Sequence, residues 1–191
     1  MRRTTMLVVC TLALALCAGT AFASTTPPAD TLKVDYFSNA NTAGAPDGTV
    51  RVTNPGTAAG NVCASFFVFD SYQELSECCS CLLTPDGLRT LSVNTDLTKN
   101  PLTGVTLNTG LIKIVSTVPV GGGCPLPTVV NSTPAIRAWV THIQNGTYAV
   151  TETASTDATL SYNEVVRLQR QCTAVQLVGS GAGICTCGSG D

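Results

Sequence analysis

Three cysteines within four residues, Cys78-Cys79-Ser80-Cys81, constrain this chain more than any other feature of its sequence. A disulfide between the neighbours Cys78 and Cys79 would need a distorted peptide, so we expect their side chains to point to opposite sides of the chain. The cluster must therefore reach distant partners. The candidates are Cys63, Cys124, Cys172, Cys185 and Cys187, and together with the cluster they make eight, an even number.

The amino terminus has the pattern of a secretory signal peptide. Arg2 and Arg3 precede an apolar run from Met6 to Ala18, and the small-residue site Ala21-Phe22-Ala23 follows. The sequence therefore predicts a signal peptide over residues 1–23, cleaved after Ala23.

Cleavage would leave a flexible leader over residues 24–30 and a single disulfide-stabilised β-rich domain over residues 31–191. It would also remove Cys10 and Cys17. All eight remaining cysteines would then lie in an oxidising compartment, where disulfides persist.

Charge excludes some partners. Without Arg2 and Arg3, eight basic residues stand against twelve acidic ones, which argues against binding to nucleic acid or to anionic membranes. No later run approaches the ~18 apolar residues of a membrane span. The charged fraction of 12% is low, and such a surface suits extracellular β proteins and also surfaces that associate with copies of themselves.

Short strands separated by turns are predicted over most of the chain. Residues 61–70 form the most apolar run, as expected of a central strand, and Asn145-Gly146 predicts a type I′ hairpin turn. Residues 71–77 instead predict a short helical turn that presents the cysteine cluster, and residues 94–110 a long surface connection with one extended piece at 105–107. The predicted strands lie at 31–37, 49–53, 61–70, 88–93, 111–118, 135–144 and 147–155.

A helix is predicted from Tyr162 to Val178 and ends at Gly179. Ser161-Tyr162-Asn163-Glu164 is a capping box, and an apolar stripe at helical spacing follows it. We expect Cys172 to pin this helix to the sheet or to the cysteine cluster. We expect Cys185 and Cys187 to bring the glycine-rich tail back toward the cluster, although four disulfides allow about a hundred pairings.

Metal binding is the alternative for the cysteines. The constellation of Cys78, Cys81, Cys185 and Cys187 offers thiolates that suit zinc, copper(I) or iron–sulfur clusters, but only Cys78 and Cys81 have the usual spacing. Export and the even count favour disulfides. A redox-active Cys-x-x-Cys would need a strand-to-helix setting that nothing in the sequence indicates.

No catalytic motif stands out. His142, the only histidine, shares a hairpin face with Ile136, Ala138 and Val140, which favours a core histidine over a catalytic base. The sequence has neither the Gly-x-Ser-x-Gly nor the His-Glu-x-x-His pattern, and Glu74 and Glu77 are expected on a surface turn. We therefore predict no enzyme, no cofactor and no metal site.

Several short motifs resemble those of a group of secreted, cysteine-rich bacterial proteins of uncharacterised function. They are Glu77-Cys78-Cys79-x-Cys81, Thr84-Pro85-Asp86-Gly87-Leu88, Asn100-Pro101-Leu102-Thr103-Gly104, Leu168-Gln169-x-x-Cys172 and Gly179-Ser180-Gly181. The resemblance implies export and a disulfide frame. It supplies neither an activity nor site residues.

Together these patterns predict a β-sandwich of about seven strands, with an immunoglobulin-like arrangement as one form, a carboxy-terminal helix and a disulfide-tied tail. The favoured function is a non-enzymatic secreted or cell-surface structural protein. Its sharper form is self-assembly, in which residues 32–37 add to the sheet of a neighbouring copy; the simpler alternative is that this strand pairs within its own domain.

Two further classes stay open. An extracellular glycan- or ligand-binding module would need exposed aromatic side chains, of which Trp139 is the main candidate. A thiol-based metal-binding or redox protein would use the cysteines instead.

Overall fold

The computed structural model describes residues 31–126 and 131–188, so the predicted signal peptide (1–23) and leader (24–30) lie outside the described residues. The elements are, in order, β1 (Leu32–Phe37), β2 (Thr49–Thr53), β3 (Val62–Asp70), β4 (Leu75–Leu83), β5 (Leu88–Ser92), the π-helical turn η3 (Val93–Leu97), β6 (Gly110–Thr117), β7 (Arg137–Ile143), β8 (Val150–Ala154), β9 (Thr156–Ala158) and α2 (Tyr162–Val178).

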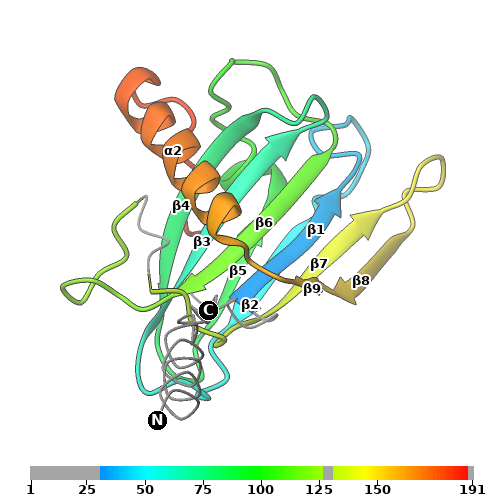
Figure 1. The fold of residues 1–191 in the computed structure, drawn as a ribbon. Helices are drawn as coiled ribbons and strands as arrows, with labels where there is room; N and C mark the ends of the chain where they lie inside the picture. The colour runs from blue at the N-terminus through cyan, green and yellow to red at the C-terminus, as the bar shows by residue number, and fades with distance from the viewer. Residues whose placement is uncertain (1–30, 127–130, 189–191) are drawn as a thin grey trace, which may run out of the picture.

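The strands form two antiparallel sheets that pack face to face (Figure 1). One sheet has the order β4-β3-β6-β1-β9, and the other has the order β5-β2-β7-β8. The predicted mainly β fold with one carboxy-terminal helix is confirmed. The described residues contain nine strands rather than about seven, because β4 and β9 were not predicted. The strand order also differs from the ABED and CFG sheets of immunoglobulin domains.

Strand β3 is the centre of the molecule and is buried on both faces, as its continuous apolar run predicts. Phe66 and Val68 face the core between the two sheets. Phe67 and Phe69 face the other way and belong to a second core, which lies beneath α2. The five-stranded sheet is therefore the middle layer of three.

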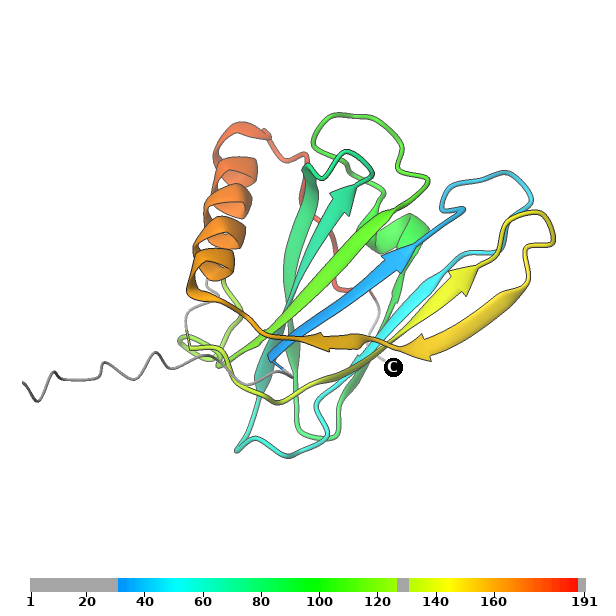
Figure 2. The ribbon, with the colours of Figure 1, turned by 45° about the vertical axis from the view of Figure 1, so that its right-hand side comes forward.

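Helix α2 has the predicted bounds. The Ser161 side chain accepts a hydrogen bond from the Glu164 N–H, and the Gly179 N–H donates to the Val175 carbonyl at the other end. Leu168, Cys172 and Val175 form its buried stripe. Figure 2 shows α2 along the outer side of the five-stranded sheet, away from β7 and β8, so no helix of the described residues covers the outer face of the four-stranded sheet.

The prediction of a helical turn over residues 71–77 is wrong. The Asp70 carboxylate accepts hydrogen bonds from the N–H groups of Tyr72 and Glu74, both at 2.9 Å, and Gln73 adopts a positive φ of 70°. These contacts make a tight turn, so β4 begins at Leu75. The cysteine cluster therefore lies on a strand and not on a helix.

The hairpin around Asn145-Gly146 forms, but its turn is not type I′. Gly146 has a φ of 84° while Asn145 does not have a positive φ, which a type I′ turn requires at both central residues. Ile143 pairs with Val150, so a longer loop joins β7 to β8. The extended piece expected at 105–107 joins neither sheet, and β5 ends at Ser92, where η3 begins.

Candidate functional site

Strand β4 separates the clustered cysteines by simple alternation. Cys79 and Cys81 point into the core between the sheets, whereas Cys78 belongs to the core beneath α2. Successive side chains of a strand lie on opposite faces, so one short strand serves two layers of the molecule. The expected divergence of Cys78 and Cys79 is confirmed.

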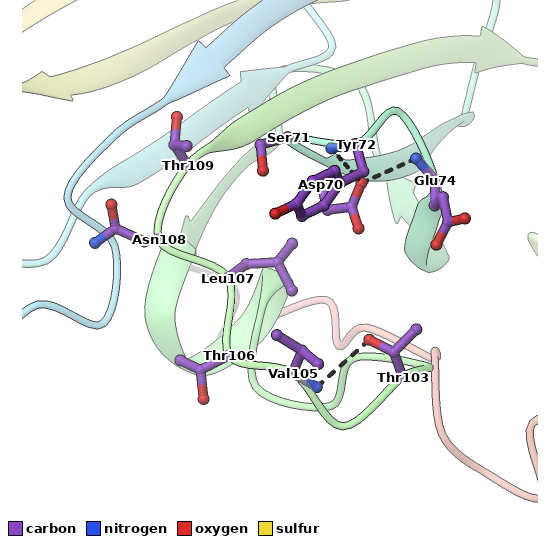
Figure 3. A pocket seen from close by; sticks show the side chains of 10 residues that line it. All are labelled: Asp70, Ser71, Tyr72, Glu74, Thr103, Val105, Thr106, Leu107, Asn108 and Thr109. Carbon is purple, nitrogen blue, oxygen red and sulfur yellow. Dashed lines mark hydrogen bonds between the residues drawn. The ribbon is translucent and has the colours of Figure 1, made fainter.

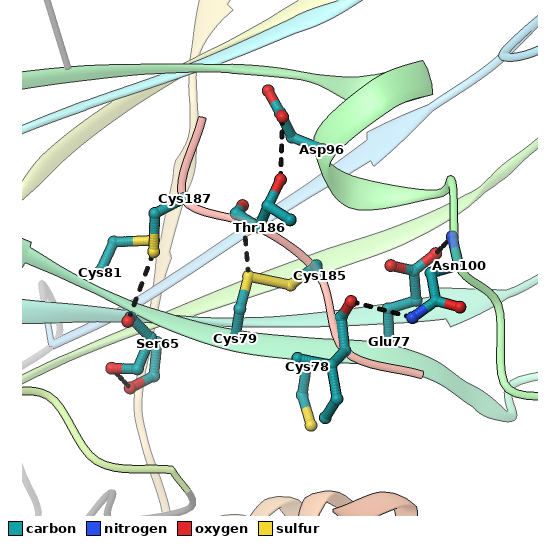
Figure 4. The surroundings of a disulfide bond; sticks show 12 residues. Ser65, Glu77, Cys78, Cys79, Cys81, Asp96, Asn100, Cys185, Thr186 and Cys187 are labelled. Carbon is teal, nitrogen blue, oxygen red and sulfur yellow. Dashed lines mark hydrogen bonds between the residues drawn. A yellow bond between two sulfur atoms is a disulfide. The ribbon is translucent and has the colours of Figure 1, made fainter. Parts of the chain in front are cut away.

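All eight predicted disulfide cysteines are paired: Cys63–Cys124, Cys78–Cys172, Cys79–Cys185 and Cys81–Cys187. Cys172 ties α2 to the cluster, as expected. The tail returns to the cluster through two neighbouring bridges (Figure 4). Three of the four disulfides thus begin on β4, the outermost strand of its sheet.

The tail also covers the free edge of β4. The Cys78 N–H donates to the Gly183 carbonyl at 2.9 Å, and the Cys185 N–H donates to the Cys78 carbonyl at 3.3 Å. The Thr186 N–H then reaches the Asp96 carbonyl of η3 at 3.0 Å. An exposed strand edge is a template for pairing with other chains, and here the chain's own tail occupies it.

These bridges leave no thiolate on the four cysteines of the metal hypothesis, and the redox hypothesis needs the same cysteines in reduced form. Within residues 31–126 and 131–188, no three His, Cys, Asp or Glu side chains are grouped so that they could hold a metal ion. Four disulfides are typical of proteins outside the cell.

Glu77 is a residue whose environment the sequence did not indicate. It was expected on a surface turn, but its side chain is fully buried on β4. One carboxylate oxygen accepts a hydrogen bond from the Asn100 N–H at 2.9 Å, and the other has no partner among the described residues. Burial raises the pKa of Glu77 to about 7, and the hydrogen bond from Asn100 offsets part of that rise.

His142 is buried, as the hairpin pattern predicted, and lies among polar groups at the junction of β1, β7 and β8. Its Nε2 is 2.8 Å from the Thr153 hydroxyl and 3.4 Å from the Asp35 carboxylate. The Tyr36 ring lies 4.4 Å from the imidazole ring, centre to centre.

This cluster does not have the geometry of a catalytic triad. In a triad, the carboxylate and the nucleophile contact opposite nitrogens of the histidine. Here Asp35 and Thr153 both approach Nε2, and Nδ1 is buried without a partner in the described part of the chain. The cluster instead ties β1 to the β7–β8 hairpin.

A surface pocket of about 310 Å³ lies between the β3–β4 turn and residues 103–109 (Figure 3). The exposed ring of Tyr72 stands at its rim, and Val105 and Leu107 lie opposite. Threonine and asparagine side chains complete the wall. The Asp70 carboxylate lies beside the pocket, but it already accepts hydrogen bonds from the N–H groups of Tyr72 and Glu74. Its main role is therefore to stabilise the turn.

Strand β8 presents an open edge on the side of the molecule away from the tail. All five of its residues are exposed, and it pairs with β7 alone among the described strands. Beside it on β7, Trp139 is 36% exposed between Arg51 and Ala154 of the neighbouring strands. The outer face of this sheet is where the aromatic residue considered for ligand binding lies.

Comparisons give no further assignment. None of the helices in the described residues is long and apolar enough to cross a membrane. The resemblance to secreted cysteine-rich proteins stays a prediction, since the chain matches no protein-family model, no curated protein and no solved structure.

Proposed function

We propose that the chain is a non-enzymatic structural protein of the cell exterior that associates with copies of itself. The observation that carries this proposal is the covalent frame centred on β4, which fixes both α2 and the tail to one strand. The domain already has two apolar cores, so the bridges are not needed to compensate for a missing core.

Such a frame suits a protein that must persist among proteases and in changing surroundings. A native disulfide contributes about 2–5 kcal/mol to the stability of a secreted domain. The low charged fraction of 12% weakens repulsion between copies, and the open edge of β8 gives copies a place to meet. Strand β1, which the sequence suggested as the strand donated to a neighbouring copy, instead pairs within its own domain, between β6 and β9. We therefore place the contact elsewhere.

The test is intact-mass analysis, native and denaturing, of the protein secreted into an oxidising compartment. We expect a metal-free mass lacking the hydrogens of four disulfides, together with an associated form whose fraction rises with concentration. Free thiols carrying bound metal would overturn the proposal, and so would a monomer at every concentration.

The pocket beside Tyr72 favours ligand binding as a second candidate function. An exposed aromatic ring next to hydroxyl and amide side chains suits a neutral, hydroxyl-rich ligand such as a glycan, which stacks on the ring and hydrogen-bonds to the wall.

The substitution Tyr72→Ala should abolish retention on polysaccharide gels if this second function is real. Tyr162→Ala is the matched control, because Tyr162 is 79% exposed on α2, outside the pocket. Equal retention of both variants and the unchanged protein would count against ligand binding in the pocket.

A further inference from the structure

We infer that β8 pairs edge to edge with β8 of a second copy, so that the four-stranded sheets of two chains join across a two-fold axis. This inference rests on the proposed self-association and names the surface that would carry it. Figure 1 shows β8 at the margin of the molecule, next to β7.

The other edges of the described sheets are short or covered. The tail is hydrogen-bonded to β4 at Cys78 and is held to the strand by the disulfides of Cys79 and Cys81. It continues to Gly188, where an added Cβ would lie only 2.8 Å from the Thr90 carbonyl oxygen, so the tail also packs against β5. Strand β9 has three residues. Strand β8, with five exposed residues, is the edge left open.

The backbone of β8 has hydrogen-bonding groups available for another strand. The Gln144 N–H donates to the Ala149 carbonyl and the Ser155 N–H to the Ala138 carbonyl, both at 2.9 Å. Because bonded and non-bonded pairs alternate in an antiparallel ladder, residues 149, 151, 153 and 155 bond to β7. Val150, Glu152 and Ala154 therefore turn their N–H and C=O groups outward.

The side chains of β8 do not block pairing at this edge. Natural edge strands are usually blocked by proline, lysine or a bulge, and β8 has none of these in its register with β7. Its one charged residue, Glu152, forms an ion pair with Arg51 of its own chain. An identical edge would thus meet a nearly neutral surface, which favours a second copy over a strongly charged partner.

Charge also disfavours one register. A symmetric pairing centred on Glu152 would set two carboxylates opposite each other, which is unfavourable. A pairing centred on Thr151 keeps outward-facing residues opposite one another and sets Val150 opposite the partner's Glu152, twice by symmetry. Val150 is 54% exposed and would lose part of that exposure.

The experiment compares Val150→Glu with Val150→Lys in the full secreted chain with its disulfides intact. Glutamate would face the partner's Glu152 and weaken association, whereas lysine would strengthen it. We expect the dimer dissociation constants of the two variants, measured by analytical ultracentrifugation, to differ roughly tenfold. The difference should shrink in concentrated salt.

Val118→Glu and Val118→Lys are the matched controls, because Val118 is 49% exposed and lies outside β8. This second pair should have equal dissociation constants. If the unchanged protein never associates, the proposed function fails together with the inference. If it associates but the two Val150 variants have equal dissociation constants, the β8 pairing is overturned while the proposed function stands.

Discussion

Glu77 is the residue whose chemistry the fold changes most. It stands directly before Cys78 on β4, and within the described part of the chain its carboxylate has a single hydrogen bond, from the backbone N–H of Asn100. The side-chain amide of the same Asn100 donates to the Gly181 carbonyl of the tail at 2.8 Å. Glu77 is thus buried where the strand, the loop and the tail meet, and its ionisation affects all three.

Stability should depend on the protonation of Glu77. Its pKa is raised in the folded protein from 4.5 to about 7, so the folded state binds a proton that the unfolded state releases. The resulting stabilisation is complete below pH 4.5 and is lost as the pH rises through 7. Between pH 5 and pH 8, urea unfolding should show a fall of about 3 kcal/mol in the free energy of unfolding.

Glu77→Gln should remove this pH dependence and make the protein more stable at pH 8, since glutamine still accepts the Asn100 hydrogen bond without a charge. Glu74→Gln is the control, because Glu74 is exposed in the preceding turn and should leave the slope unchanged. A slope that persists in Glu77→Gln would show that another group causes it.

Helix α2 depends on both packing and one covalent bond. Leu168 and Val175 pack on the five-stranded sheet, and Cys172 between them is bonded to Cys78, closing a separation of 94 residues. Replacing both cysteines by alanine should lower the free energy of unfolding by about 2–5 kcal/mol. Because the lost bond holds the helix, hydrogen exchange should accelerate first in α2.

The paired alanine variant of Cys63 and Cys124 provides the comparison, because that bridge includes no residue of α2. It should leave exchange in α2 slow while the chain around Cys124 becomes more exposed. Equal loss of protection in both variants would mean that the bridges act globally.

Elements with a clear local sequence pattern were predicted correctly. Helix α2 followed from its cap and its stripe, and β3 from its continuous apolar run. Strand β4 was missed because cysteine and glutamate occupy its buried positions, so that disulfides rather than hydrophobicity determine its pattern. Turn η3 was missed because Val93 was assigned to the preceding strand, and Leu97 lies in a stretch that otherwise reads as a loop.

The site was less predictable than the fold. The sequence identified all eight cysteines and the destinations of the helix and the tail, but not the pairs, because pairing depends on which strand faces which. The open edge of β8 could not be predicted either. An edge is a property of the whole sheet order, and the order β5-β2-β7-β8 joins strands far apart in the sequence.

At the scale of the whole molecule, the two sides of the sandwich differ in how their edge strands are covered. On one side the tail covers β4 and reaches η3, and two disulfides hold it there. On the other side β8 is left open. Because the edge of β4 is covered and the edge of β8 is open, association would be directed to a single strand. The products would then be defined assemblies instead of random aggregates.

Releasing the tail should therefore convert ordered association into aggregation. Alanine at Cys79, Cys81, Cys185 and Cys187 would leave the tail attached to β4 by backbone hydrogen bonds alone. We expect proteases to cut the tail and light scattering to rise on mild warming, since an uncovered β4 edge can pair with other chains. The double alanine variant of Cys78 and Cys172 keeps both tail bridges and should stay clear under the same conditions. A clear solution and an uncut tail in the fourfold variant would show that backbone bonds suffice to guard the edge.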